Sequence, residues 1–342
     1  MKKIRVGIVG AGANTVAQHI PRLQALAGVE VVSVANRSRA SAERVAQQFA
    51  IPTVYDRWED LVAAADSDAI VVGTWPYLHA RVTLAALAAG KHLLCEARMA
   101  MNAAEARQMY DAACANSHLV AQLVPSPYTL AVDATIQRLL AEGYLGELLA
   151  IDIHGGGGFI DHDAPLHWRQ NGDLSGLNVL SLGIWYEALL RWVGEASRVV
   201  ALGRTFVRQR RDSDGLLRAV RVPDHLDIVA EMACGAQARF QFSAVTGHAG
   251  APSATLYGSE GTLRFSDGRL LGGGRGDAEL REITIPDHER GFWRVEEEFI
   301  GAIRGTEQLR LTDFATGLKY MQFTEAVAQS MASGSVVVLP IV

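Results

Sequence analysis

Short apolar segments alternate with helical patterns through the first third of the chain, and this alternation constrains the fold more than any other feature. One helical segment opens with Asn102 and, three residues later, Glu105, a pattern typical of a capping box. Short buried strands that alternate with helices predict a parallel sheet with helices on both faces. The predicted strands are residues 4–9, 29–35, 69–73, 92–95 and 119–123, and the predicted helices are 39–49, 81–89 and 103–116.

The pattern changes after Pro125-Ser126-Pro127, where helices and strands begin to occur in separate runs. Residues 148–154 and much of 199–284 have strand character, and helices are predicted at 130–142, 178–193, 292–303 and 314–331. Separate runs of this kind indicate an α+β domain with a large, mostly antiparallel sheet. We therefore predict an α/β, Rossmann-type domain over 1–124 and an α+β domain over 125–342.

Charge and cysteine content exclude several classes of partner. The net charge is −5, from 32 basic and 37 acidic residues, so neither nucleic acid nor an anionic membrane is expected to bind. The most apolar long window, 176–194, contains Asn178, Glu187 and Arg191, which argues against a membrane span. The three cysteines lack the spacing of a disulfide framework, and the start of the chain does not have the pattern of a signal peptide. We expect a cytoplasmic protein.

A glycine-rich turn follows the first predicted strand. Gly10 and Gly12 allow a tight turn, and the helix that follows offers N–H groups to a pyrophosphate, so we expect Gly10, Gly12, Ala13 and Asn14 to contact a dinucleotide. Thr15 stands where a third glycine is usual. Glycines at such a turn can also be purely structural, but their position in a strand–helix–strand series favours cofactor binding.

The end of the second predicted strand bears on the choice of cofactor. It reads Asn36-Arg37-Ser38, without the carboxylate that would bind the ribose 2′-hydroxyl of NAD. A guanidinium beside a small hydroxyl suits a 2′-phosphate, so NADP is favoured and NAD is the second choice. The alternative is that Arg37 and Arg39 belong to a solvated turn.

Several stretches together resemble the Gfo/Idh/MocA oxidoreductase family, over nearly the whole chain. That resemblance implies a nicotinamide cofactor, contacts to it from Thr74, Trp75, Pro76, His79 and Glu96, and a substrate such as a sugar or cyclitol. It further implies that residues 1–124 bind the dinucleotide and that residues 125–342 serve substrate binding and oligomerisation, with a homodimer or homotetramer built on the second domain's sheet as the expected assembly. The stretches are the glycine turn, Gly73-Thr74-Trp75-Pro76-Tyr77-Leu78-His79, residues 88–96, Gly143-Tyr144-Leu145-Gly146-Glu147, Trp168-Arg169, and residues 183–192.

The chain departs from the family where the family places its acid–base groups. Its Glu-Lys-Pro motif falls on Glu96-Ala97-Arg98, so Ala97 stands in place of the lysine. In a second motif, Ser181, Trp185 and Ala188 stand in place of Asp, His and Asp. At about 100° per residue these three share one helix face with Trp192, whereas Tyr186 and Glu187 point elsewhere and are interpreted as packing and surface residues.

Four other residues are candidates for the chemistry: His162, His167, Arg98 and Tyr128. The histidines have an ordinary pKa near working pH, the arginine could polarise a carbonyl, and the tyrosine could act as a phenolic acid or simply pack. The predicted substrate-binding residues are Trp185, Ser181, Trp168 and Arg169, although Trp185 could equally be core. The histidines near 154–167 lack a recognisable ligand spacing, so no metal site is predicted.

Three functions remain open at this point. The first is an NADP-dependent oxidoreductase with non-standard acid–base residues, acting on a sugar-like or cyclic ketone, alcohol or imine. The second is an enzyme that keeps its dinucleotide bound and recycles it in each turnover, as in a lyase or glycosidase. The third is a sensor or partner protein that binds the cofactor without catalysis.

Overall fold

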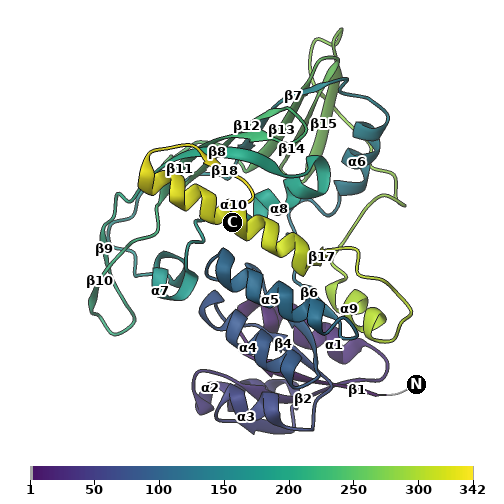
Figure 1. The fold of residues 1–342 in the computed structure, drawn as a ribbon, viewed down its shortest axis with the longest axis vertical. Coiled ribbons are helices and arrows are strands. Elements are labelled where there is room, and N and C mark those ends of the chain that lie inside the picture. Colours follow the sequence, from purple (N-terminus) through teal and green to yellow (C-terminus); the bar gives the residue numbers. More distant parts are fainter. Residues whose placement is uncertain (1–2, 342) are drawn as a thin grey trace. The chain divides into compact units, whose positions relative to one another are not determined.

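The computed structural model describes residues 3–341, which divide into two units (Figure 1). The first unit is the chain up to Pro125 together with Arg294–Leu318, and the second is Ser126–Trp293 together with the chain from Lys319. The sequence predicts one domain boundary, after residue 124, and that prediction does not include the return of residues 294–318 to the first unit. They return because β17 (Thr312–Asp313) pairs with β6 (Ala121–Leu123) at the edge of its sheet.

The first unit is built on a seven-stranded sheet in the order β17-β6-β5-β4-β1-β2-β3. All neighbours are parallel except β17, which runs antiparallel to β6. The strand order reverses at β1, which has β4 on one side and β2 on the other, and such a point is where doubly wound sheets bind ligands. The prediction of a Rossmann-type α/β domain is confirmed. The remaining strands are β1 (Ile4–Val9), β2 (Val29–Ala35), β3 (Thr53–Tyr55), β4 (Ala69–Val72) and β5 (His92–Cys95).

The helices of this unit begin where their local sequence signals place them. In α5 the Asn102 side chain accepts a hydrogen bond from the N–H of Glu105 (2.8 Å), and the Glu105 carboxylate accepts one from Met101 (3.0 Å), which supports the predicted helix start. The fourth helix begins earlier than predicted, because Pro76 suits a first helical position. The helices are η1 (Thr15–His19, a π-helix), α1 (Ile20–Ala25), α2 (Arg39–Phe49), α3 (Trp58–Ala63), α4 (Pro76–Ala88), α5 (Ala103–Ala115) and α9 (Val295–Ile303).

The second unit is built on a nine-stranded sheet in the order β16-β15-β14-β13-β7-β12-β11-β8-β18. Its neighbours are antiparallel except for the parallel pair of β12 and β7, so the predicted mostly antiparallel sheet is confirmed. A separate two-stranded ribbon pairs β9 with β10. The strands are β7 (Leu148–His154), β8 (Ala196–Arg204), β9 (Gln209–Arg211), β10 (Leu217–Ala219), β11 (His225–Met232), β12 (Gln237–Ser243), β13 (Ser253–Gly258), β14 (Gly261–Ser266), β15 (Arg269–Gly274), β16 (Arg281–Glu282) and β18 (Val337–Val338).

One face of this sheet is covered by α8, whose Tyr186 ring stacks on Phe323 of α10 at 3.7 Å between centroids and lies 6.4 Å from Phe240 of β12. Helix α8 starts later than predicted, because Leu180 has a positive φ of 43° that interrupts the helix. The helices are α6 (Asp133–Ala141), η2 (Trp168–Gln170, a 3₁₀ helix), α7 (Gly172–Ser175), α8 (Leu182–Val193) and α10 (Phe314–Ser333). No helix within residues 3–341 is both long enough and apolar enough to cross a membrane.

The interpretation of Glu187 as a surface residue is wrong. Its side chain is 1% exposed, and its carboxylate accepts hydrogen bonds from Arg191 (2.8 Å) and from the N–H of Ser126 (2.9 Å). Helical periodicity placed Glu187 off the predicted site face, but α8 is buried on more than that face, and a buried carboxylate is tolerated where charged and hydrogen-bonding partners meet it.

Candidate dinucleotide site and acid–base residues

The glycine turn between β1 and η1 requires glycine at its first position. Gly10 has a φ of +83°, and a Cβ there would lie 2.4 Å from the Thr74 side chain and 2.9 Å from the Thr74 nitrogen. A neighbouring N–H, that of Ala11, donates to the side-chain oxygen of Asn36 at 2.7 Å. The turn therefore lies against the ends of β2 and β4, with its backbone close enough to approach a pyrophosphate.

Thr15 takes the place of the third glycine without pushing the helix away from the sheet. It is buried, and a Cβ on Gly73 would lie only 2.0 Å from the Thr15 side-chain oxygen. In the usual fingerprint a glycine on the helix allows the helix to pack closely on the strand. Here the helix carries Thr15, and Gly73 beyond β4 has no side chain to collide with it. The structure accommodates this departure from the fingerprint.

A cavity of about 540 Å³ lies beside this turn, within the first unit. Six of the twelve predicted cofactor residues line it: Gly10, Gly12, Asn36, Arg37, Thr74 and Trp75. Several other lining residues come from α2 and from the segments around β3, α3 and α4, and the sequence did not indicate their part in the cavity: Ser41, Asp56, Arg57, Trp58, Glu59, Tyr77, Leu78 and Arg81.

The cavity lining has more guanidinium groups than unpaired carboxylates. Arg37, Arg57 and Arg81 line it, and the Arg37 guanidinium lies 5.8 Å from the centroid of the Trp75 ring. Of the two lining carboxylates, Asp56 is bound by Arg39 at 2.9 Å, and Glu59 lies 3.6 Å from Arg57 and 4.0 Å from Arg81. Arg39 also pairs with Glu43 and does not line the cavity, so its guanidinium is held by protein carboxylates. The turn and this cationic lining fit a dinucleotide whose adenosine end is negatively charged.

The amide of Asn36 is already used within the protein. Its nitrogen donates to the Ser41 hydroxyl at 3.1 Å, while its oxygen holds the glycine turn. Ser38 caps α2 by accepting from the N–H of Ser41 at 3.4 Å. Arg37 therefore remains the group best able to engage a substituent on the adenosine ribose.

Ala13, Asn14, Ser38, Pro76, His79 and Glu96, the other predicted cofactor residues, do not line this cavity. Pro76 is the first residue of α4. The His79 ring is fully buried between the carbonyl oxygens of Arg98 (2.9 Å) and Thr74 (3.0 Å), and burial lowers its pKa although those carbonyls oppose the shift. His79 thus clamps two loops together.

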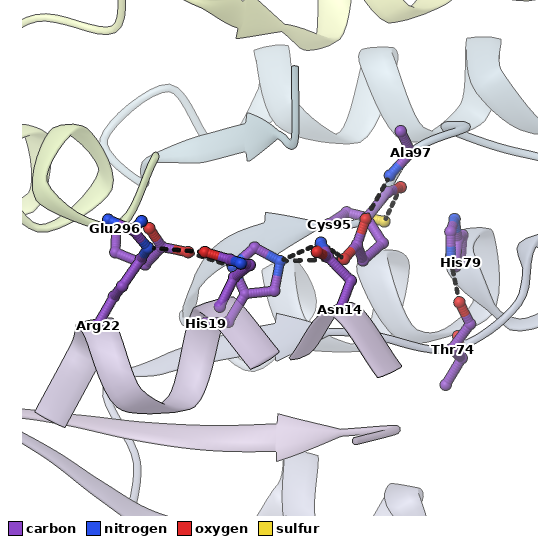
Figure 2. A network of polar contacts seen from close by, with 10 residues as sticks. Asn14, His19, Arg22, Thr74, His79, Cys95, Ala97 and Glu296 are labelled. Carbon is purple, nitrogen blue, oxygen red and sulfur yellow. Dashed lines mark hydrogen bonds and ion pairs between the residues drawn. The ribbon is translucent and has the colours of Figure 1, made fainter. Parts of the chain in front are cut away.

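Asn14 and Glu96 join a polar cluster around the buried His19 that the sequence did not reveal (Figure 2). The amide of Asn14 donates to Glu96 at 2.5 Å, and His19 lies 3.0 Å from the same carboxylate oxygen. The other ring nitrogen of His19 contacts Glu296 of α9. Because Glu296 is 277 residues away in the chain, no local pattern could have paired it with His19.

Ala97 and Arg98 follow Glu96 on the next loop. The N–H of Ala97 donates to the second Glu96 oxygen at 3.2 Å, and Arg98 is buried, at 5% exposure. The Ala97 methyl group offers neither a proton nor a charge, so position 97 has no group that can exchange the hydroxyl proton of a substrate.

In the second unit, two predicted residues lie close together. The Tyr128 ring is 5.5 Å from that of Trp185 and is 48% exposed, whereas Trp185 is 1% exposed and also lies 6.3 Å from Phe265. The ring nitrogen of Trp185 has no hydrogen-bond partner among the described residues. Ser181 precedes α8 and lies against Gly155. Tyr128 is thus the accessible ring of this group.

The other four predicted residues occupy an exposed loop before α7. His162 is exposed, and His167 is the N-cap of η2, where Nδ1 accepts from the N–H of Arg169 at 3.3 Å. Burial, together with the charge of Arg169, lowers the pKa of His167. The Arg169 guanidinium stacks over Trp168 at 4.3 Å from the ring centroid. Across residues 3–341, no group of three or more His, Cys, Asp or Glu side chains is arranged to hold a metal ion.

Family models match most of the chain. One, described as an oxidoreductase family with an NAD-binding Rossmann fold, matches residues 4–122, and a model of the Gfo/Idh/MocA C-terminal domain matches residues 134–264. Among curated relatives, trans-1,2-dihydrobenzene-1,2-diol dehydrogenase of Oryctolagus cuniculus is 30% identical over 206 residues. That match covers 59% of this chain and about 60% of the length of the relative.

Solved structures show the same fold over the full length. An oxidoreductase domain protein from Kribbella flavida has a TM-score of 0.87 at 23% identity, covering 100% of both chains. Levoglucosan dehydrogenase, solved in complex with NADH and L-sorbose, has a TM-score of 0.85 at 22% identity and 99% coverage of both. At these identities the likeness establishes the two-domain fold.

Proposed function

Because the chain belongs to the Gfo/Idh/MocA family of oxidoreductases, we propose that it is an NADP-dependent oxidoreductase acting on a sugar-like or cyclic alcohol, ketone or imine. The observation that carries the choice of NADP is the end of β2, where Arg37 lines the cavity and no carboxylate is free to bind a ribose 2′-hydroxyl. NAD is the second choice, and the NADH complex of levoglucosan dehydrogenase is consistent with it.

The substrate class rests on the relatives and on the aromatic groups of the second unit. Trans-1,2-dihydrobenzene-1,2-diol dehydrogenase is named for a cyclic diol, and levoglucosan dehydrogenase was solved with a sugar. Tyr128 beside Trp185 offers a partly exposed aromatic surface, which packs well against the flat face of a ring. Trp168 with Arg169, and Ser181, complete the proposed substrate-binding set.

The bound dinucleotide would supply hydride chemistry, and the chain must supply the proton. With Ala97 in the family's lysine position, we assign proton transfer to His162, His167 or Tyr128. Nδ1 of His167 accepts from the N–H of Arg169, so the neutral ring, which its lowered pKa favours, carries its hydrogen on Nε2 and would donate that hydrogen to a substrate oxygen. Arg98, permanently charged and next to Ala97, would polarise a carbonyl oxygen rather than exchange a proton.

The test begins with nucleotide-stripped protein titrated with NADPH and NADH by fluorescence. Micromolar binding of NADPH with weaker binding of NADH supports the assignment, and a screen of cyclic diols, anhydrosugars and cyclic ketones then follows absorbance at 340 nm. Product formation without net change in NADPH would favour a recycled cofactor, for which tightly retained dinucleotide is the signature. Binding without turnover of any compound would favour a non-catalytic cofactor-binding protein. The alanine at position 97, in place of the family's lysine, supports that alternative.

We also propose a homodimer or homotetramer that forms through the open face of the second unit's sheet. Leu202 is 77% exposed, and Val200, which is 40% exposed, stands in register with Val229 on the neighbouring strand. Exposed apolar side chains clustered on one sheet face are typical of an interface. Leu202→Lys should shift the mass measured by light scattering towards the monomer.

The location that we propose is the cytoplasm. The three cysteines form no disulfide, which is consistent with a reducing compartment.

A further inference from the structure

Two buried ionisable side chains and a third that is largely buried meet beside the glycine turn, from parts of the chain that are far apart in sequence (Figure 2). His19 ends η1, Glu96 follows β5, and Glu296 lies in the first turn of α9. The side chains of His19 and Glu296 are 0% exposed, and that of Glu96 is 14% exposed. Asn14 adds a fourth polar group, bound to Glu96. All four belong to the first unit.

Both ring nitrogens of His19 face carboxylate oxygens, so both must carry protons to donate hydrogen bonds. Burial alone would lower the pKa of His19, but the hydrogen bonds with Glu296 and Glu96 raise it to about 9. Burial would likewise raise the pKa of Glu96, but His19 holds it below its ordinary value.

Glu96 is also held in one orientation. Its Oε1 accepts from Asn14 and from His19, and its Oε2 accepts from the N–H of Ala97. A carboxylate with donors on both oxygens has little freedom to rotate, so its negative charge is fixed in place. His19 supplies the only cation among these donors, and Glu296 in turn fixes the His19 ring.

The place of Glu96 in the sheet relates this charge to the cofactor. In a doubly wound sheet the dinucleotide lies across the carboxyl ends of the strands, with its pyrophosphate at the first turn. The arginine-lined cavity lies towards β2, on one side of β1, and is the proposed adenosine end. The nicotinamide end then extends to the other side, towards β4 and β5, where Glu96 directly follows the last residue of β5.

We propose that His19 is a positioning residue that fixes the Glu96 carboxylate at the nicotinamide end of the site, so that the protein prefers the oxidised cofactor to the reduced one. The oxidised nicotinamide ring carries a positive charge that a fixed carboxylate attracts, whereas the reduced ring is neutral. Removing His19 takes away the cation that holds the pKa of Glu96 below its ordinary value and one of the donors to its Oε1, so the charge and orientation of that carboxylate are no longer fixed. This inference rests on the proposed dinucleotide function.

The experiment measures the dissociation constants of NADP+ and NADPH for the purified full-length protein by calorimetry at pH 7. His19→Gln and Glu96→Gln should each lower the preference for NADP+ over NADPH, measured as the ratio of the two constants, by about tenfold. Glu298→Gln is the matched control: it lies two residues from Glu296 on α9, is equally buried, and binds Gln122 and the N–H groups of Arg310 and Leu311 instead. It should lower the melting temperature and leave the ratio unchanged.

A purely structural role for His19 gives a different result. His19→Gln would then weaken both cofactor forms by the same factor, as Glu298→Gln would, and the unchanged ratio would overturn the proposal. Glu96→Gln keeps the test decisive if His19→Gln does not fold, because it removes the charge with little change in volume. Wild-type protein that binds neither cofactor would instead overturn the proposed function, on which this inference depends.

Discussion

Replacing Arg37 with alanine should weaken NADPH binding about ten- to thirtyfold and NADH binding by less than about threefold. A hydrogen bond to a charged group contributes about 1.5–3 kcal/mol, and each 1.4 kcal/mol is about tenfold in affinity. Arg37 is exposed, so solvent screening places its contribution near the lower end of that range, at about 1.5–2 kcal/mol. Arg57 and Arg81 line the same cavity, so residual attraction for the 2′-phosphate should survive.

The assay is a fluorescence titration of wild type and variant with each reduced cofactor, at low salt and at 0.3 M salt. Arg44→Ala is the matched control, because it removes the same charge from an exposed position on α2 that does not line the cavity. Arg39→Ala is a poor control, since it would release Asp56 into the cavity as an unpaired carboxylate. Equal weakening of NADPH and NADH by Arg37→Ala would refute the assignment of Arg37 to the 2′-phosphate.

Three further predictions concern the acid–base residues and the buried charges. Ala97→Lys alone should not produce strong sugar dehydrogenase activity, because the family's partner His and Asp are also missing; robust turnover in a 340 nm assay would contradict this. Glu187→Ala should lower the free energy of unfolding in urea by about 3–5 kcal/mol, since it leaves the largely buried Arg191 without that partner; a loss below 1 kcal/mol would count against the ion pair. The contribution of His19 to stability should be complete below pH 6.5 and should decline as the pH rises towards about 9, whereas that of Glu96 should be present above pH 4.5 and should decline as the pH falls. The melting temperature of His19→Gln should therefore fall less between pH 7 and pH 9 than that of wild type.

Local sequence signals were sufficient for the first unit's sheet and for the helix that starts after Asn102. Strands of four to seven mostly buried residues between turns leave little choice of fold, and the side chain of Asn102 forms the predicted cap. Segment 53–63 was missed because β3 is only three residues long and α3 only six. Such short elements carry too little periodicity to be recognised and depend on packing against their neighbours.

The candidate site was predictable only where its residues follow strands. Asn36, Arg37, Thr74 and Trp75 each stand just beyond a strand end, and all four line the cavity. His19 and Glu296 could not be found in this way, because their pairing depends on a segment that returns to the first unit after a long part of the second, Ser126–Trp293. Glu187 was misread for a related reason: its partner Ser126 lies 61 residues away, and only the tertiary fold brings that N–H to the carboxylate.

The departures from the family pattern have different consequences in the two parts of the site. At the glycine turn, the loss of a glycine at Thr15 is compensated by Gly73, so the cradle for a pyrophosphate is retained. At Ala97 no such compensation exists nearby. His19 and Glu96 are bound to each other in a buried cluster, and His79 is enclosed between two carbonyl groups with a lowered pKa. A group tied in this way must break a buried hydrogen bond before it can exchange a proton with a substrate, which makes it a poor acid or base. His19, Glu96 and His79 are therefore poor candidates for the proton transfer, and substitution of Tyr128, His162 and His167 one at a time is the direct test of the acid–base residues proposed above.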